Sequence, residues 1–300
     1  MFFMLRKPVI PRRPFSFPSM PFTRRRCDNM KKIVLKRTAA LLAAAVMLAL
    51  CGCGIGSGNS GKDDSLQKVL DKGQLILGLD VGFPPMGFVD GSGEITGFDI
   101  DMAEEVCSRL GVKLVKQGIN WDDKEDLLNG GAIDCIWNGM SITPARAEAM
   151  NLSEAYMKNE LILVIRGDSD VKDMRELTGR TIGVQSGSSA QDAIEASSYY
   201  SKVSVVQFED NLSLLESLAN GGVDVALVDS TVAYYFISSS SEQFFILTDS
   251  LGEEEYAIGF RKNDRALRDR VQEIISEMKA DGTLGKISKK WFGSDITTVR

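Results

Sequence analysis

The sequence contains no histidine among its 300 residues. This absence excludes Ser-His-Asp and Cys-His nucleophile arrangements, and it excludes every metal site that uses an imidazole ligand. Cysteine is scarce as well, with five residues in the whole chain. Two of them, Cys107 and Cys135, lie among apolar neighbours in a helix pattern and a strand pattern, so we expect buried thiols. The sequence therefore predicts neither a metal nor a redox cofactor.

The apolar run from 39 to 50 has twelve residues, whereas a membrane-spanning helix needs about 20. It follows Lys31, Lys32, Lys36 and Arg37, which is the layout of a secretory signal. Because the run ends at a cysteine after a small residue, residues 30–52 resemble a bacterial lipoprotein signal peptide. This resemblance implies that Cys53, which follows Gly52, carries the lipid.

Two alternatives remain for this segment. Cys51 is a second candidate for lipidation, but bulky Leu50 precedes it where the lipoprotein pattern has a small residue. The segment is also compatible with an ordinary cleaved signal. Residues 1–29 show no helical or strand period and are interpreted as a mis-called start or a disordered extension. The Gly/Ser-rich residues 53–64 predict a flexible tether.

Positive charge is scarce in the remainder of the chain. Removing residues 1–52 takes away 11 Lys/Arg but one acidic residue, Asp28, and leaves a net charge of −16. Such acidity disfavours nucleic acid or anionic lipid as a binding partner. The remaining 248 residues can form one large domain or two lobes with an adequate core, and we expect a monomer.

Apolar runs alternate with amphipathic segments along the body of the chain, which predicts an α/β fold with mainly parallel sheets flanked by helices. The expected strands are 75–79, 113–117, 132–137, 161–166, 181–185, 203–208, 223–228 and 256–261, and the clearest helices are 66–72, 99–110, 267–278 and 287–292. A helix end, a glycine turn and a strand occur at 127–134 and again at 215–224. This repetition predicts two lobes of similar build.

Three strand ends carry residues that could contact a ligand. After the strand at 132–137, Thr143 can cap a helix that begins at Pro144, which places Arg146 in the first turn, where a cation is favourable only beside a bound anion. Taken alone, Arg146 is better explained as a solvated surface arginine. The turn at 186–189 follows the strand at 181–185 and forms a second possible anion cradle, although plain helix capping explains it equally well. Asp229 stands at the carboxyl end of the strand at 223–228.

These segments, in this order, resemble the polar amino-acid-binding proteins of ABC importers, which have the type II periplasmic-binding fold. The resemblance covers roughly residues 65–293 and rests on Asp80 with 83–85, 97–101, 131–134, 141–146, 183–189, 224–229 and 279–293. One departure is Leu152-Ser153-Glu154-Ala155-Tyr156, where the family has Phe-Ser-Asp-Pro-Tyr. The resemblance implies an amino acid bound between two lobes and delivered to a permease.

The resemblance also implies ligand-binding roles. Arg146 and the amides of Ser141 and Ser189 would hold the α-carboxylate, assisted by Ser188, and Asp229 would pair with the α-ammonium. Phe83 and Trp121 would form an aromatic clamp, although both would more often be core residues. The full candidate set is Asp80, Phe83, Trp121, Asn138, Gly139, Ser141, Arg146, Ser188, Ser189 and Asp229. Asp80 would lie near the ligand side chain, and Asn138 stands at a position that varies, so the amino acid itself is not specified.

The expected architecture has lobe 1 at 64–160 plus 256–300 and lobe 2 at 161–255, joined by crossing segments near 158–161 and 254–256. We expect no enzymatic activity and a location outside the cytoplasm, anchored by lipid to the outer face of the cytoplasmic membrane. One alternative is a dehydratase-type enzyme on the same fold, with Asp80 and Asp229 as an acid/base pair. Another is the ligand-binding part of a sensor or channel, which would require a spanning helix or a signalling domain.

Overall fold

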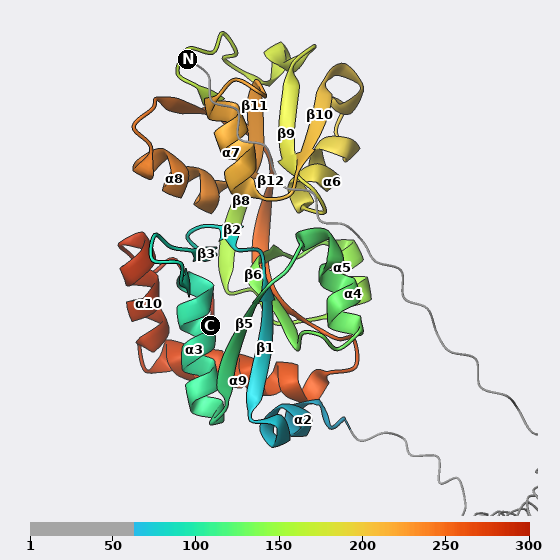
Figure 1. The fold of residues 1–300 in the computed structure, drawn as a ribbon, viewed down its shortest axis with the longest axis vertical. Coiled ribbons are helices and arrows are strands. Elements are labelled where there is room, and N and C mark those ends of the chain that lie inside the picture. The colour runs from blue at the N-terminus through green and yellow to red at the C-terminus, as the bar shows by residue number, and fades with distance from the viewer. Residues whose placement is uncertain (1–62) are drawn as a thin grey trace, which may run out of the picture. The chain divides into compact units, whose positions relative to one another are not determined.

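The computed structural model describes residues 63–300, which form a mixed α/β fold around a large sheet (Figure 1). Eight of its nine strands run in the order β10 (Ser204–Phe208), β9 (Thr181–Gln185), β11 (Val225–Asp229), β8 (Met157–Arg166), β12 (Phe244–Phe260), β6 (Cys135–Ser141), β1 (Gln74–Leu79) and β5 (Lys113–Gly118). The ninth, β7 (Asn151–Leu152), pairs with β12. A smaller sheet contains β2 (Gly82–Phe83), β3 (Gly87–Val89) and β4 (Ile95–Thr96).

Helices pack on the sheet in two parts. The β1 part comprises β1, β5 and β6 with α2 (Ser65–Lys72), α3 (Phe98–Leu110), α4 (Lys124–Asn129), α5 (Pro144–Ala149), α9 (Arg265–Ala280) and α10 (Thr283–Phe292). The β9 part comprises β9, β10 and β11 with α6 (Ser189–Ala196), α7 (Asn211–Ala219) and α8 (Ser230–Ser239). Short 3-10 helices are η1 (Trp121–Asp123), η2 (Met174–Leu177) and η3 (Tyr200–Lys202). Figure 1 shows β8 and β12 running between the two parts.

Parallel pairing is found inside each part. Strand β1 pairs in parallel with β5 and β6, and β9 pairs in parallel with β10 and β11. Strands β8 and β12 pair antiparallel with each other, and they also pair antiparallel with β11 and β6 respectively. The predicted α/β fold with mainly parallel strands in each half is confirmed, and the two antiparallel strands join the halves into one sheet.

Three strands have bounds that differ by more than two residues from those predicted. Strand β8 begins at Met157 and not at 161, since the polar residues at 158–160 interrupt the apolar run from which the strand was predicted. Strand β6 begins at Cys135 and continues to Ser141, because the polar residues that follow Trp137 are buried along with the apolar ones. Strand β12 begins at Phe244 and not at 256. Its register shifts twice between Ile246 and Gly252, and an acidic run follows, so the alternation on which strand prediction depends is lost.

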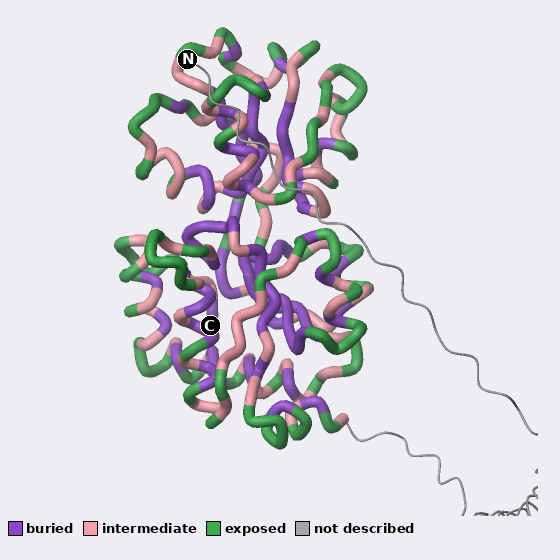
Figure 2. Tube along the Cα trace, viewed as in Figure 1, coloured by how far each residue is buried: buried purple, intermediate pink, exposed green. Residues whose placement is uncertain are grey.

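Residues coloured as buried in Figure 2 follow most of the strands and recur along the helices. The apolar ones among them form the hydrophobic core. The prediction of buried thiols is confirmed, since Cys107 and Cys135 are both buried and unpaired. Burial raises the pKa of the Cys107 thiol to about 12, which keeps it protonated and unreactive. Both cysteines therefore act as small apolar core residues.

The two predicted crossing segments lie side by side. Asn159 on β8 stands opposite Glu254 on β12, and Met157 stands opposite Tyr256. The lobe boundaries at 160/161 and 255/256 stay a prediction.

Several features concern only the part of the chain that the structure describes. Within residues 63–300, no helix has the length and hydropathy needed to cross a membrane. The same residues contain no cluster of three or more Cys, His, Asp or Glu side chains arranged to hold a metal ion. The extension at 1–29, the signal peptide at 30–52, Cys51, Cys53 and nearly all of the tether lie outside the described residues.

Candidate functional site

Eight of the ten predicted site residues line one narrow cavity between the β1 part and the β9 part. The cavity is nearly closed, with about 10 Å³ of space for the centre of a water-sized sphere. Its lining consists of Phe83, Trp121, Gly139, Ser141, Arg146, Gln185, Ser188, Ser189 and Asp229. The fold therefore brings residues that are up to about 150 positions apart in the sequence onto one surface, mostly at strand ends.

Arg146 reaches the cavity from α5. As predicted, α5 begins at Pro144, and the Thr143 hydroxyl accepts a hydrogen bond from the Arg146 backbone N–H at 3.2 Å. The guanidinium donates from Nη1 to the Ser141 carbonyl at 2.9 Å and from Nη2 to the Gly187 carbonyl at 3.2 Å. This side chain is thus bonded to backbone oxygens on both sides of the cavity.

The guanidinium of Arg146 has no carboxylate partner among the described residues, where no Asp or Glu oxygen lies within 4.0 Å of it. The residue is nevertheless buried, with 5% of its surface exposed. Burial lowers the pKa of Arg146, because a cation removed from water loses solvation. The charges of Asp192, Glu254 and Asp229 act on Arg146 only from longer range, so its direct partners are carbonyl oxygens. A buried cation of this kind is a strong site for an anion.

The turn after β9 supplies the facing wall. Ser188 caps α6, its hydroxyl accepting from the Gln191 N–H at 3.1 Å and donating to the Gln185 carbonyl at 2.7 Å. Ser189, the first residue of α6, donates its hydroxyl to Ser141 Oγ at 3.3 Å. The predicted helix capping is confirmed, and Ser188 and Ser189 also line the cavity. The anion cradle at this turn stays a prediction.

Asp229 stands at the end of β11, as the sequence predicts. Its Oδ1 accepts hydrogen bonds from Asn159 Nδ2 and from the Tyr256 hydroxyl, the latter at 2.8 Å. Burial and then the nearby charge of Glu254 raise the pKa of Asp229 to about 7. A cation placed beside this carboxyl would favour its charged form.

The two predicted aromatic residues form walls of the cavity. Phe83 and Trp121 are each 6% exposed, so they are core-like in burial and still line the site. Trp121 lies in η1, where the preceding Asn120 side chain accepts from the Asp122 N–H at 3.0 Å and fixes the turn. The Lys124 ammonium lies 5.2 Å from the centroid of the Trp121 ring.

Asp80 and Asn138 are the two predicted residues that do not line the cavity. Asp80 Oδ2 accepts from Gln185 Nε2 at 2.7 Å, and its Oδ1 accepts from the Gly82 N–H at 2.7 Å. Asn138 Oδ1 accepts from the Asp80 N–H at 3.1 Å. Burial raises the pKa of Asp80 to about 6. Asp80 is therefore linked to the cavity by its hydrogen bond with Gln185, and Asn138 is linked to Asp80 by a second hydrogen bond.

Sequence reasoning missed several residues of this site. Gln185 lines the cavity at the carboxyl end of β9, and its position just before the turn was the signal that could have found it. Asn159, Glu254 and Tyr256 lie on the crossing strands, where no local motif marks them. Asn159 Nδ2 donates to both Asp229 and Glu254, and Ser141 Oγ donates to Glu254 at 2.7 Å.

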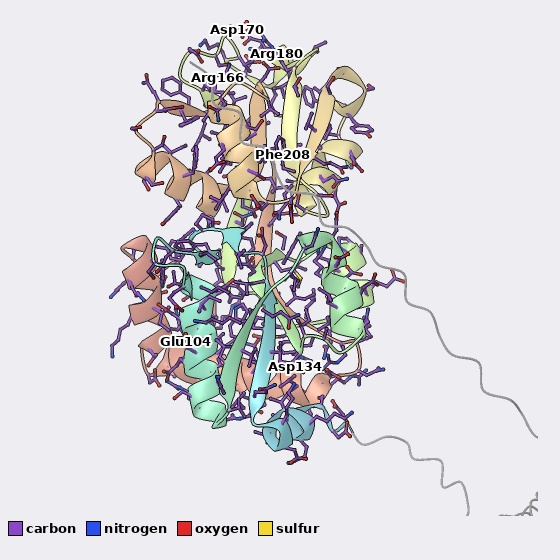
Figure 3. All side chains as sticks on the ribbon, viewed as in Figure 1. Glu104, Asp134, Arg166, Asp170, Arg180 and Phe208 are labelled. Carbon is purple, nitrogen blue, oxygen red and sulfur yellow. The ribbon has the colours of Figure 1, made fainter. Side chains whose placement is uncertain are left out.

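The described residues also line two larger hollows. One, of about 610 Å³, adjoins the site, because Asn159 and Glu254 line it together with other residues of β8 and β12, Ile142 and Ser230. Another, of about 680 Å³, includes Arg166. Figure 3 shows Arg166, Asp170 and Arg180 at the end of the β9 part that is remote from the β1 part. The Arg166 guanidinium donates to the Leu218 and Val223 carbonyls at 3.1 and 3.2 Å. Both hollows are open, and neither holds a buried charge without a partner, so the narrow cavity is the candidate site.

Comparison with known proteins identifies the family. The model of the bacterial extracellular solute-binding proteins, family 3, matches residues 75–294. The chain belongs to this family. The family 3 solute-binding protein described here is 31% identical to the arginine-binding extracellular protein ArtP of Bacillus subtilis, over 88% of this chain and 98% of that protein. It is 27% identical to the L-cystine-binding protein TcyJ of Escherichia coli, over 89% of this chain and 100% of that protein.

A solved structure gives a similar result. The substrate-binding protein of an ABC uptake transporter from Streptococcus pneumoniae, determined with bound histidine, is 36% identical to this family 3 solute-binding protein. The TM-score is 0.76, with 78% of this chain and 98% of that chain covered. The predicted resemblance and the type II periplasmic-binding fold are confirmed.

Proposed function

We propose that this chain is the substrate-binding subunit of an ABC importer, which captures a polar amino acid and delivers it to the permease. The observation that carries this proposal is the pair of buried, opposite charges on the cavity, Arg146 without a carboxylate partner and Asp229 at the facing strand end. An amino-acid zwitterion supplies the complement of each charge. Burying it is favourable only if both of its charges are paired.

The proposed binding mode follows from the atoms on the cavity. The α-carboxylate binds Arg146 with the backbone amides of Ser141 and Ser189, and Ser188 assists from the same turn as Ser189. The α-ammonium binds Asp229, whose Oδ1 already accepts two hydrogen bonds and is thereby held in place. Phe83 and Trp121 enclose the aliphatic part of the ligand, and Gly139 provides backbone contact.

The ligand side chain is proposed to be polar. Gln185 lines the cavity and donates a hydrogen bond to Asp80, which lies outside the lining. A polar amide backed by a carboxylate therefore forms one side of the cavity. The relatives named above bind arginine, cystine and histidine, and this chemistry suits such ligands. We include Asp80 and Asn138 as the residues that orient Gln185 toward the ligand side chain.

Capture is proposed to proceed by closure of two lobes, 64–160 plus 256–300 and 161–255. The β1 part supplies Arg146, Ser141 and the aromatic walls, whereas the β9 part supplies the turn at 186–189 and Asp229. Because each lobe offers half of the site, a bound amino acid stabilises the closed arrangement. We further propose that the mature chain is a monomer outside the cytoplasm, anchored to the membrane by lipid on Cys53.

A binding role rather than a catalytic one is part of this proposal. The alternative, a dehydratase on the same fold, needs an acid/base pair that meets the substrate in the cavity. Asp229 lines the cavity, but Asp80 meets it only through Gln185, which disfavours that pair. Incubating the purified chain with prephenate or arogenate should give no turnover, and product formation would support the enzyme alternative.

The experiment that tests the receptor proposal is a thermal-shift screen of refolded protein against the common amino acids and cystine. A ligand that binds the folded state alone raises its stability by RT ln(1 + [L]/Kd). The expected result is a selective shift with one or a few polar amino acids, confirmed by calorimetry. Absence of any shift would contradict the proposal.

A further inference from the structure

Lys124 is a second buried cation beside the cavity. It is the first residue of α4, and 6% of its surface is exposed. No Asp or Glu oxygen among the described residues lies within 4.0 Å of its ammonium group. Lysine is rarely buried without an acidic partner, because its charge loses solvation that nothing restores. A function is therefore required to explain its position.

The contacts of Lys124 connect the two parts of the structure. Its Nζ donates to the Trp121 carbonyl at 3.1 Å within the β1 part and to the Gly187 carbonyl at 3.1 Å in the β9 part. An ammonium group has three N–H donors, so one donor has no acceptor among the described residues. The side chain therefore bridges the aromatic wall and the turn at 186–189.

Arg146 converges on the same acceptor. Its Nη2 donates to the Gly187 carbonyl at 3.2 Å, so the two cationic nitrogens lie no more than about 6 Å apart. Two buried like charges at this separation repel each other, and the Gly187 carbonyl is the acceptor that they share. Both cations belong to the β1 part, so closure does not change their connectivity but removes them from water, which strengthens their repulsion, and an anion between them would offset it.

The turn that receives these bonds is closely fitted to the β1 part. Ser186 Oγ donates to Asp122 Oδ2 at 2.7 Å. Gly187 has φ +65°, and a Cβ there would lie 2.3 Å from Asp122 Oδ1. The turn at 186–189 therefore packs directly on residues 121–124, with no room for a side chain at position 187.

We propose that Lys124 is a second recognition charge for the α-carboxylate, which acts with Arg146 to make closure of the cleft dependent on a bound anion. This inference rests on the proposed amino-acid receptor function. Without a carboxylate, closure buries two repelling cations, and with one, a shared negative charge lies between them and offsets their repulsion. Lys124 thus acts through its charge and through its hydrogen bond to the Gly187 carbonyl. It is a positioning residue that disfavours closure of the empty cleft and favours closure on a bound carboxylate.

The charges around Lys124 agree with this role. Burial and then Arg146 lower the pKa of Lys124 to about 8. Glu125 on its own helix, Asp122 on η1 and Asp192 on α6 oppose that shift without cancelling it. The ammonium is therefore charged near pH 7 and still lacks a counter-charge at close range.

The test compares Lys124→Met with Lys124→Arg and with the control Lys113→Met, which changes an exposed lysine on β5. The probes are L-arginine and L-histidine, each paired with its α-amide, in which the carboxylate is neutral. Lys124→Met should weaken binding of the amino acids about tenfold, the size of one lost charge contact. It should not weaken binding of the amides, because closure without an anion becomes easier when one cation is removed. Lys124→Arg keeps the positive charge, so its dissociation constants for the amino acids should lie within about threefold of those of wild type.

A second readout does not depend on the probe. Small-angle scattering of the ligand-free full chain should show a smaller radius of gyration for Lys124→Met than for wild type, because its closed form buries one cation fewer. Equal weakening of acids and amides, or unchanged affinity with unchanged dimensions, would overturn the inference. If wild type binds no amino acid in the thermal-shift screen, the receptor proposal itself fails and the inference falls with it.

Discussion

Replacing Arg146 by Gln separates a binding role from a structural one. The guanidinium makes two hydrogen bonds to carbonyls at 2.9 and 3.2 Å and has no carboxylate partner among residues 63–300. In the ligand-free protein, Gln therefore loses about 2 kcal/mol of hydrogen bonding. It also removes a buried charge whose desolvation costs a similar amount. We expect Arg146→Gln to change the melting temperature by less than about 5 °C.

The effect on ligand binding should be much larger. Removing one partner of a buried, hydrogen-bonded charge pair typically costs about 3–5 kcal/mol. Taking the lower part of that range, about 3–4 kcal/mol, the dissociation constant for the amino acid should rise about 100- to 1,000-fold. Titration calorimetry at pH 7.5 measures this change directly.

The matched control is Arg180→Gln, which breaks an exposed ion pair with Asp170 in the β9 part (Figure 3). That change should leave both affinity and melting temperature almost unaltered, because exposed pairs contribute little. Affinity within threefold of wild type for Arg146→Gln would refute the assignment of Arg146 to the ligand carboxylate. A fall of more than about 10 °C in its melting temperature, with proportionate loss of binding, would indicate a structural role instead.

Three further predictions concern other residues of the site. The pKa of Asp229 is raised to about 7, so this carboxyl becomes neutral below that pH. The affinity for the amino acid, measured by calorimetry, should therefore fall from pH 8 to pH 5. Asp229→Asn should bind the amino acid about 100-fold more weakly than wild type and without that pH dependence. Asp99 lies next to the cavity and not on it, and its Oδ2 accepts a hydrogen bond from the Gly139 N–H at 2.7 Å. Burial raises the pKa of Asp99 to about 7, so the folded state binds its proton more tightly than the unfolded state, and the free energy of unfolding should decrease between pH 4 and pH 7. Urea titrations of Asp99→Asn should show a smaller decrease. A side chain at position 187 would collide with Asp122, which would disfavour the closed arrangement. Gly187→Ala should therefore speed ligand release about tenfold in stopped-flow measurements. The control Gly91→Ala, at an open position, should not change the release rate.

Local sequence signals predicted the parts of the site that depend on neighbouring residues. Thr143 and Pro144 specify the start of α5 through capping and a preset φ, and Arg146 follows at a fixed position. Asp229 was predicted for the same kind of reason, since it ends an apolar run that reads as a buried strand. In both cases a few adjacent residues determine where the functional group lies.

Residues whose roles depend on pairing between distant strands were not predictable in this way. Asn159 and Glu254 meet because β8 and β12 pair antiparallel, and nothing near either residue in the sequence encodes that register. The same applies to Lys124, which no sequence motif marks and which meets the turn at 186–189 through the Gly187 carbonyl. Asp80 was predicted at the ligand side chain, but the structure places Gln185 between Asp80 and the cavity.

The division of charges between the two parts explains why such a site can act as a sensor of its ligand. Two cations, Lys124 and Arg146, belong to the β1 part, whereas the carboxyl of Asp229 belongs to the β9 part. Bringing the parts together desolvates all three charges, and the protein supplies no direct pairing between them within 4.0 Å among the described residues. A zwitterion supplies the missing counter-charges at both ends, so the free energy of closure depends on the ligand and not on contacts between the lobes alone. Removing a cation should therefore have opposite effects on the two equilibria: empty closure becomes easier, while closure on an amino acid becomes weaker.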